Sequence, residues 1–287
     1  YVMGGNEGVS FTGLNSLPNV HMTSADYDVS VATASTIGLG DSDEVTIALT
    51  SAIPTRGAAS PATPVSLTYD GIETFNVVTA GSTTGSATRT LTLDSNQLET
   101  LNLSGAAGAN ITVAMQGAAN VEQVGTVDAS EMTGALLATI TAGSSGLLDI
   151  TGGAGNDTLT IGAMSEDYTI DGGAGLDTLV VTSAAYDEDS TTGQVGDGVT
   201  NVEVLLVSGS ADLAAFSNNT FAALASAGSA TISEIGTEAV SLTMATAGTT
   251  VKLDRATDGA ADEATVTFGG ATEFAVTTLN VADEESL

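Results

Sequence analysis

Short runs in which every second residue is apolar dominate the chain and most constrain its fold. The intervening residues are mostly small or polar, and Gly, Asp, Asn or Ser bounds most runs. Because side chains of a β-strand point alternately to opposite faces, such runs predict half-buried strands. Examples lie at residues 45–49, 91–93, 101–103 and 111–115. We therefore expect an all-β protein with few or no helices, and one or two helical turns only in the Ala-rich stretch 216–227.

A second pattern indicates that these strands form a repeat. An apolar residue, a Glu and two further alternating apolar residues occur at residues 72–77 and 98–103, and looser copies begin at Val121 and Val202. One coil of a β-solenoid cannot bury its apolar face alone, so neighbouring coils must repeat the pattern. This favours a right-handed parallel β-solenoid or β-roll segment with additional short strands, and similar strands of a β-sandwich are the alternative. The glutamates of these boxes could cap the strand ladder or ligate a metal, and we favour capping or solvation: they are Glu73, Glu99, Glu122 and Glu203.

A longer repeat sets the expected domain organisation. Residues 40–47 resemble residues 259–266, and residues 11–14 resemble residues 221–224. The chain therefore looks like one large unit with parts of its neighbours, cut from a longer tandem protein; chance similarity in Gly-, Thr- and Ala-rich sequence is the alternative. The expected parts are the end of a preceding repeat unit at 1–30, a β-solenoid unit at 31–230 that contains a motif pair at 145–182, and the start of the next unit at 231–287.

The charge of the chain excludes several classes of function. It carries 35 acidic residues against 4 basic ones, for a formal net charge of −31. Nucleic-acid binding needs a basic footprint, and adsorption to anionic lipid needs basic residues as well. No apolar segment approaches the roughly 20 residues of a membrane helix, so we expect no membrane insertion. Without cysteine there is no disulfide framework, and we expect a divalent metal to supply the crosslinks.

Sequence signatures of enzymes are missing. His21 is the only His, so a zinc site with two or more histidines is impossible and a Ser-His triad would depend on this residue alone. His21 lies in an apparent strand, where we interpret it as an ordinary strand residue. The chain has no P-loop and no dinucleotide fingerprint. We expect no catalytic activity and name no catalytic residue.

Two nine-residue segments carry the sharpest chemical signal. Residues 152–160 and 172–180 both match Gly-Gly-x-Gly-x-Asp-x-apolar-x. Glycine permits the positive φ that turns backbone carbonyls inward, and Asp adds a hard anionic oxygen of the kind that Ca²⁺ binds. An ordinary pair of Gly-rich turns capped by Asp is the alternative. The predicted calcium-binding residues are Gly152, Gly153, Ala154, Gly155, Gly172, Gly173, Ala174 and Gly175, through their backbone, and Asp157 and Asp177, through their carboxylates.

The spacing of the two motifs predicts one calcium site between their Gly-rich loops. The half-turn between them has no Gly pair, and Tyr168 stands where an Asp would be needed for a second site. The apolar residues expected to point inward are Ile150, Leu159, Ile170 and Leu179. Other acidic clusters are weaker metal candidates because none has the spacing of an EF-hand loop. These weaker candidates are Asp41, Asp43, Asp258 and Asp262.

The two nonapeptides are similar to those of the RTX (repeats-in-toxin) family of secreted calcium-binding proteins. The order of further motifs resembles the lattice-forming region of Caulobacter-type surface-layer (S-layer) proteins. These motifs are residues 101–105, residues 127–134, the RTX pair, the Val202 box and residues 221–224. The resemblance implies type I secretion without an N-terminal signal, folding with calcium, and assembly into a sheet on the outer membrane. Two departures are the small number of RTX repeats and the lack of a recognisable lipopolysaccharide-anchoring domain, so anchoring and any polysaccharide contact would belong to other parts of the parent protein.

Together these observations predict a structural extracellular protein at the bacterial cell surface. It would be a calcium-stabilised segment that self-associates into a lattice or filament. A repeat module of an RTX adhesin or biofilm-matrix protein is one alternative, and a calcium-dependent appendage of a secreted hydrolase is another.

Overall fold

The computed structural model confirms an all-β chain with parallel strand pairing. The chain divides into two compact units: unit 1 comprises Tyr1–Asp157 with Gly173–Gly175, and unit 2 comprises Thr158–Gly172 with Leu176–Leu287. The residues described are 9–14, 19–22, 29–33, 43–49, 65–69, 71–80, 89–95, 97–115, 125–142, 146–184, 194–226, 229–235, 240–244, 250–255, 264–268 and 278–281.

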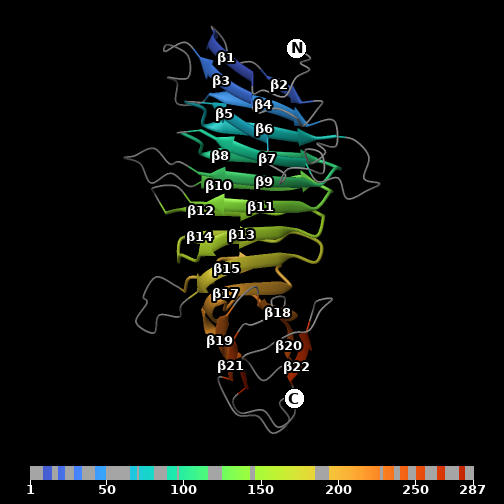
Figure 1. Ribbon diagram of the computed structural model, residues 1–287, viewed down its shortest axis with the longest axis vertical. Helices are drawn as coiled ribbons and strands as arrows, with labels where there is room; N and C mark the ends of the chain where they lie inside the picture. Colours follow the sequence, from blue (N-terminus) through green and yellow to red (C-terminus); the bar gives the residue numbers. More distant parts are fainter. Residues whose placement is uncertain are drawn as a thin grey trace. The chain divides into compact units, whose positions relative to one another are not determined.

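In unit 1, successive strands alternate between two parallel sheets (Figure 1). The first sheet has the order β1 (Val9–Leu14), β3 (Val29–Thr33), β5 (Val65–Tyr69), β7 (Arg89–Asp94), β9 (Ala109–Ala114) and β11 (Leu136–Thr141). The second contains β2 (Val20–Met22), β4 (Glu44–Leu49), β6 (Thr74–Thr79), β8 (Thr100–Gly105), β10 (Gly125–Met132) and β12 (Leu148–Thr151). We call one strand of the first sheet, the following strand of the second and their connections a coil.

The alternating sequence pattern explains the two faces of these sheets. Val45, Phe75 and Leu101 are in register on β4, β6 and β8, and each is almost completely buried. Asn76 and Asn102 are also in register but are half-exposed, and Asn102 Nδ2 donates to Asn76 Oδ1 at 2.7 Å. The apolar residues therefore form an inner row from coil to coil, while the polar residues form an outer row.

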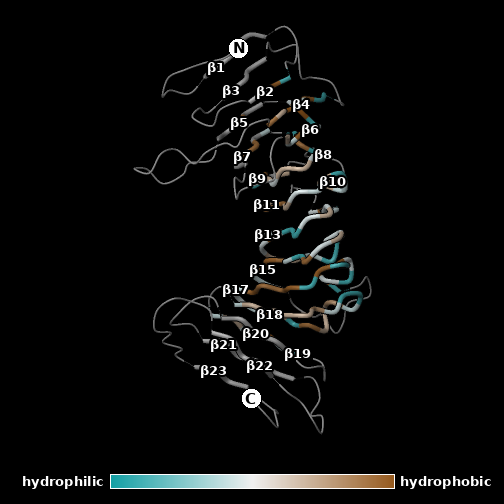
Figure 2. The backbone as a smooth tube through the Cα atoms, turned by 90° about the vertical axis from the view of Figure 1, so that its right-hand side faces the viewer, coloured by the Kyte–Doolittle hydropathy of each residue, from teal (hydrophilic) through white to brown (hydrophobic). Residues whose placement is uncertain are grey.

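Unit 2 contains a continuation of the same alternation and then a different arrangement. One sheet begins with β13 (Thr158–Ala163), β15 (Thr178–Ala184) and β17 (Val204–Asp212), and the other contains β14 (Tyr168–Asp171) and β16 (Val199–Thr200). Figure 2 shows hydrophobic stretches in β15 and β17. After β17 come two rows of strands: β18 (Ala223–Ser226), β20 (Val240–Met244) and β22 (Ala264–Phe268), and β19 (Ala230–Ile235), β21 (Thr250–Arg255) and β23 (Thr278–Val281).

The sheet forks at β17, which pairs with two strands on the same side. Residues 204–207 pair with β18, and residues 210–212 pair with β19. Gly209 lies between the two stretches, where a Cβ would be only 2.2 Å from the carbonyl oxygen of Thr182 on β15. The ladder between β15 and β17 also changes register there, as expected of a bulge. A bulge that only glycine can fill thus separates the two rows of strands.

The helical expectation for residues 216–227 is wrong. A single 3₁₀ turn, η1 (Leu213–Ala215), precedes this stretch, and β18 occupies its last part. Phe216 is 3 % exposed and packs against Gly196 and, edge to face, against Phe221 with 5.1 Å between the ring centroids. The stretch is therefore irregular, because its aromatic side chains cover the turn before β16 and are not spaced along one helical face.

The predicted inward register at the two nonapeptides is confirmed. Ile150, Leu159, Ile170 and Leu179 are all at most 1 % exposed. The right-handed, closed form of the solenoid and the repeat boundaries after residues 30 and 230 stay predictions. Among the described residues, no helix has the length and apolar character needed to span a bilayer.

Candidate calcium-binding loops

Unit 1 brings the first Gly-rich loop together with the middle of the second. Ala174 N donates to the Gly153 carbonyl at 2.9 Å, and Ala154 N donates to the Met132 carbonyl at 2.8 Å. The backbones approach so closely that a Cβ on Gly173 would lie 2.3 Å from the Gly153 oxygen. A side chain at Gly173 is therefore incompatible with this stacking, and the positive φ that the motif predicted is found at Gly173 and Gly175.

Asp157 is the acidic residue of the first motif and belongs to unit 1. Its side chain is 1 % exposed; Oδ2 accepts from Gly153 N at 2.7 Å and Oδ1 accepts from Leu136 N, at the start of β11, at 2.8 Å. Both donors are neutral amides, and the chain has only 4 Lys and Arg residues that could neutralise its carboxylates. Burial raises the pKa of Asp157 above its ordinary value of 3.8, although the two amide hydrogen bonds oppose that shift.

Asp177, the corresponding residue of the second motif, belongs to unit 2. It is also 1 % exposed, and its backbone is bound to the coil that follows. Asp177 N donates to Glu203 Oε2 at 2.7 Å, while the Asp177 carbonyl accepts from Glu203 N at 3.1 Å and Val204 N at 2.9 Å. The carboxylate atom Oδ2 is buried and receives no hydrogen bond. The two motif aspartates are thus held in different ways.

The Glu boxes and the RTX aspartates occupy the same structural position. Asp157, Asp177 and Glu203 directly precede β13, β15 and β17, whose first residues are in register. In the other sheet Glu73 precedes β6, and its Oε2 accepts from Asp43 N at 2.7 Å. Capping is therefore confirmed for Glu73 and Glu203, and each carboxylate binds the backbone one coil back.

The weaker metal candidates are not supported by a cluster. Asp41, Asp258 and Asp262 lie outside the described residues, as does Glu122. Asp43 is half-buried beside Glu73, and Glu99 follows one coil later, with Glu99 N donating to the Glu73 carbonyl. Within the described ranges, no group of three or more His, Cys, Asp or Glu side chains is arranged to hold a metal ion.

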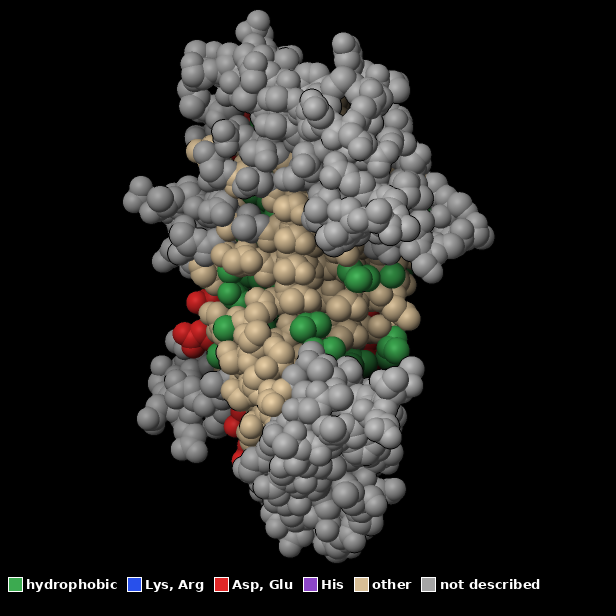
Figure 3. Space-filling model, viewed as in Figure 1, with side chains coloured by type: hydrophobic (Ala, Val, Ile, Leu, Met, Phe, Trp, Pro, Cys, Tyr) green, Lys and Arg blue, Asp and Glu red, His purple; other side chains and the backbone are tan. Residues whose placement is uncertain are grey.

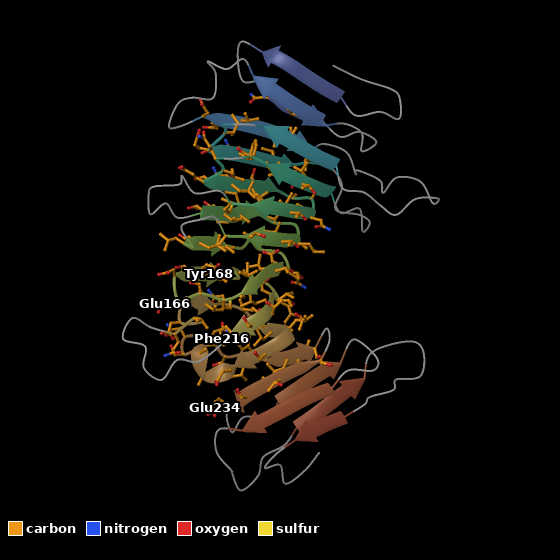
Figure 4. The ribbon with its side chains drawn as sticks, turned by 60° about the vertical axis from the view of Figure 1, so that its left-hand side comes forward. Glu166, Tyr168, Phe216 and Glu234 are labelled. Atoms are coloured by element: carbon orange, nitrogen blue, oxygen red, sulfur yellow. The ribbon has the colours of Figure 1, made fainter. Side chains whose placement is uncertain are left out.

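The half-turn between the two motifs belongs to unit 2 and carries Tyr168 where the motif would need an Asp. Tyr168 is half-buried at the start of β14, beside the exposed Glu166 and Asp167 (Figure 4). Burial raises the pKa of the Tyr168 hydroxyl, and the Asp167 charge adds to this shift. The face shown in Figure 3 is mostly polar or backbone where it is described, with a few acidic and apolar groups.

The buried carboxylates predict an unusual dependence of stability on pH. Burial raises the pKa of Glu73 above its ordinary 4.5, with Asp43 and Glu99 contributing, and Asp157 is shifted in the same direction. A raised pKa in the folded state contributes stability at low pH that is lost as the pH rises through the folded pKa. In calcium-free buffer, the free energy of unfolding that these two groups contribute should therefore decrease as the pH rises from about 4 through their raised pKa values.

Urea unfolding at several pH values, with the wild type beside E73Q, tests this prediction. The substitution should flatten the decrease, because an amide does not titrate. Asp197 behaves oppositely, because hydrogen bonds from Ser217 and Gln194 N lower its pKa. The pH dependence of stability of the whole chain therefore mixes both kinds of group, and the comparison of wild type with E73Q isolates the contribution of Glu73. A wild type and E73Q with equal pH dependence would contradict the prediction.

Comparisons with models of known protein families, with curated proteins and with solved structures find no match.

Proposed function

We propose that this chain is a calcium-stabilised segment of a structural extracellular protein that self-assembles on a bacterial surface. The observation that carries the proposal is the stacking of two Gly-rich loops, the first of which donates from Gly153 N to the buried carboxylate of Asp157. This arrangement occurs in parallel sheets in which each strand pairs with strands of neighbouring coils. Such architectures build extended scaffolds from repeated units, which suits a structural role better than a catalytic one.

The donor set of the loops fits calcium. It consists of two buried aspartates and the carbonyls of Gly-rich backbone, all hard oxygen donors of the type Ca²⁺ prefers. Buried charges in proteins are usually paired or coordinate metals, and the donors placed on Asp157 are neutral. A divalent cation at the loops would add positive charge beside these carboxylates. From the sequence motif, we propose Asp157, Asp177 and the loop carbonyls as calcium ligands.

The charge of the chain gives calcium a role in folding as well as in local structure. At −31, self-repulsion opposes a compact state. Each bound Ca²⁺ offsets two negative charges and links neighbouring coils through their loops. Extracellular calcium modules have Kd values of roughly 10⁻⁴–10⁻³ M, so stabilisation would be realised outside the cell, at millimolar calcium.

Negative-stain electron microscopy of the purified chain in millimolar Ca²⁺ and in chelator tests the proposal. We expect sheets or filaments only with calcium. Dispersed folded particles in both buffers would contradict self-assembly of this chain and shift support to an adhesin module or an enzyme appendage. Sheets that persist in chelator would contradict the role of calcium while leaving the structural role intact.

A further inference from the structure

Glu203 stands outside both nonapeptides, yet it binds the main chain of a proposed calcium ligand. Its Oε2 accepts from Asp177 N at 2.7 Å, and its own N–H donates to the Asp177 carbonyl at 3.1 Å. We propose that Glu203 is a positioning residue of the calcium site, fixing the backbone from which the Asp177 carboxylate projects. This inference rests on the proposed calcium binding and goes beyond it, because the motif stops at residue 180.

The position of Glu203 is itself well fixed. The preceding residue, Val202, is 2 % exposed, and Asn219 binds it on both sides of its backbone: Asn219 Oδ1 accepts from Val202 N at 3.1 Å and Nδ2 donates to the Val202 carbonyl at 2.8 Å. Leu205, two residues later, is completely buried and in register with Leu179. Glu203 is therefore half-buried between Val202 and Leu205, which hydrogen bonds and burial hold in place. From this position its carboxylate accepts from Asp177 N.

The geometry also explains why an acidic residue is needed. Two main-chain donors of the following coil, Glu203 N and Val204 N, satisfy the Asp177 carbonyl, and the Glu203 side chain accepts from the Asp177 N–H. A carboxylate makes a stronger acceptor for a backbone N–H than a neutral group does. Loss of this acceptor would remove one of the hydrogen bonds that orient the peptide before Asp177. Residues that orient metal ligands in this manner typically change metal affinity by 10–100-fold when they are replaced.

Glu73 provides a matched control in the same chain. It belongs to the same type of box in unit 1, and its Oε2 likewise accepts from a backbone N–H one coil back, that of Asp43, at 2.7 Å. Replacing Glu73 by Ala should therefore lower stability as E203A does. It should leave the calcium affinity of the Gly-rich loops unchanged, because none of their predicted ligands is bonded to it. Its partner Asp43, a weaker metal candidate by sequence, belongs to no metal-holding cluster among the described residues.

The experiment measures calcium affinity of the full chain by titration calorimetry for wild type, E203A, E203Q and E73A. We expect Kd to rise about tenfold in E203A, much less in E203Q, which keeps an acceptor oxygen, and not at all in E73A. Thermal unfolding in chelator shows which variants fold, and exchange of the Asp177 amide hydrogen in chelator should be faster in E203A than in E73A.

The outcomes separate this inference from the function on which it rests. A wild type that does not bind calcium would overturn the calcium proposal and the inference with it. A wild type that binds, with an E203A variant of equal affinity, would overturn the positioning role alone. Equal losses in E203A and E73A would show a general effect of stability and would also overturn it. If E203A does not fold in chelator, an E203Q variant with unaltered affinity and faster exchange of the Asp177 amide would count against the role.

Discussion

Replacing Asp157 and Asp177 together by Asn is expected to abolish stabilisation by calcium. At free calcium about 100-fold above Kd, an ion that binds only the folded state adds about 2.7 kcal/mol to the free energy of unfolding. The variant D157N/D177N should gain none of this, because each amide offers one neutral oxygen in place of a carboxylate. Urea unfolding with and without calcium measures the difference directly.

The same substitution should also cost stability without calcium. Both oxygens of Asp157 accept backbone hydrogen bonds, from Gly153 N and Leu136 N. An Asn side chain can accept only one of them and turns its NH₂ group toward the other donor. A buried amide left without an acceptor costs about 1–3 kcal/mol, so the variant should be weaker in chelator as well.

The matched control is D149N/D167N, which removes the same two charges at a half-buried and an exposed position outside the loops. It should retain the full response to calcium. Equal loss of the response in both double variants would mean that calcium acts on overall charge and that the loops hold no specific site.

The second large effect is expected from Gly173→Ala. Gly173 has φ of +91°, and its Cβ would lie 2.3 Å from the Gly153 oxygen and 3.0 Å from the Gly152 carbonyl. The left-handed backbone costs about 1–2 kcal/mol for a residue with a side chain. Separating the two loops adds the cost of overpacking, for a total of about 3 kcal/mol or more. Calcium affinity should fall in parallel, because the loops no longer stack.

Gly146→Ala separates these two causes. Gly146 has φ of +74°, but nothing lies within 4 Å of an added Cβ. It should lose only the backbone contribution, about 1–2 kcal/mol, and keep calcium affinity. Chemical unfolding measures the free energy of unfolding of both variants. Equal losses of stability would contradict our inference that close approach of the two loops makes Gly173 necessary.

The strand pattern and the buried register could be predicted from the sequence because they depend on local alternation. Leu159 and Leu179 alternate with threonines and valine, and a parallel sheet buries one face of that pattern wherever the strand lies. The glycines at 153 and 173 could likewise be assigned to Gly-rich turns, because the nonapeptide motif is typical of such turns.

Other features could not be predicted, because they depend on which residues meet across coils. Glu203 and Asp157 belong to motifs that look unrelated, and only the strand register places both before strands of one sheet. The sequence does contain a signal for these caps: an acidic residue stands one position before an alternating run, and it caps the preceding coil. The fork at β17 had no such signal, because Gly209 is one of 34 glycines and its role depends on the carbonyl of Thr182.

That fork has a mechanical consequence. In many tandem proteins, adjacent segments are joined by a tether that extends before either segment bears tension. Here β17 contributes backbone hydrogen bonds to both β18 and β19, and residues 213–222 between β17 and β18 are themselves bonded through Asn219 and η1. A pull on either row of strands would therefore load the ladder that joins its first strand directly to β17, with no flexible tether between them.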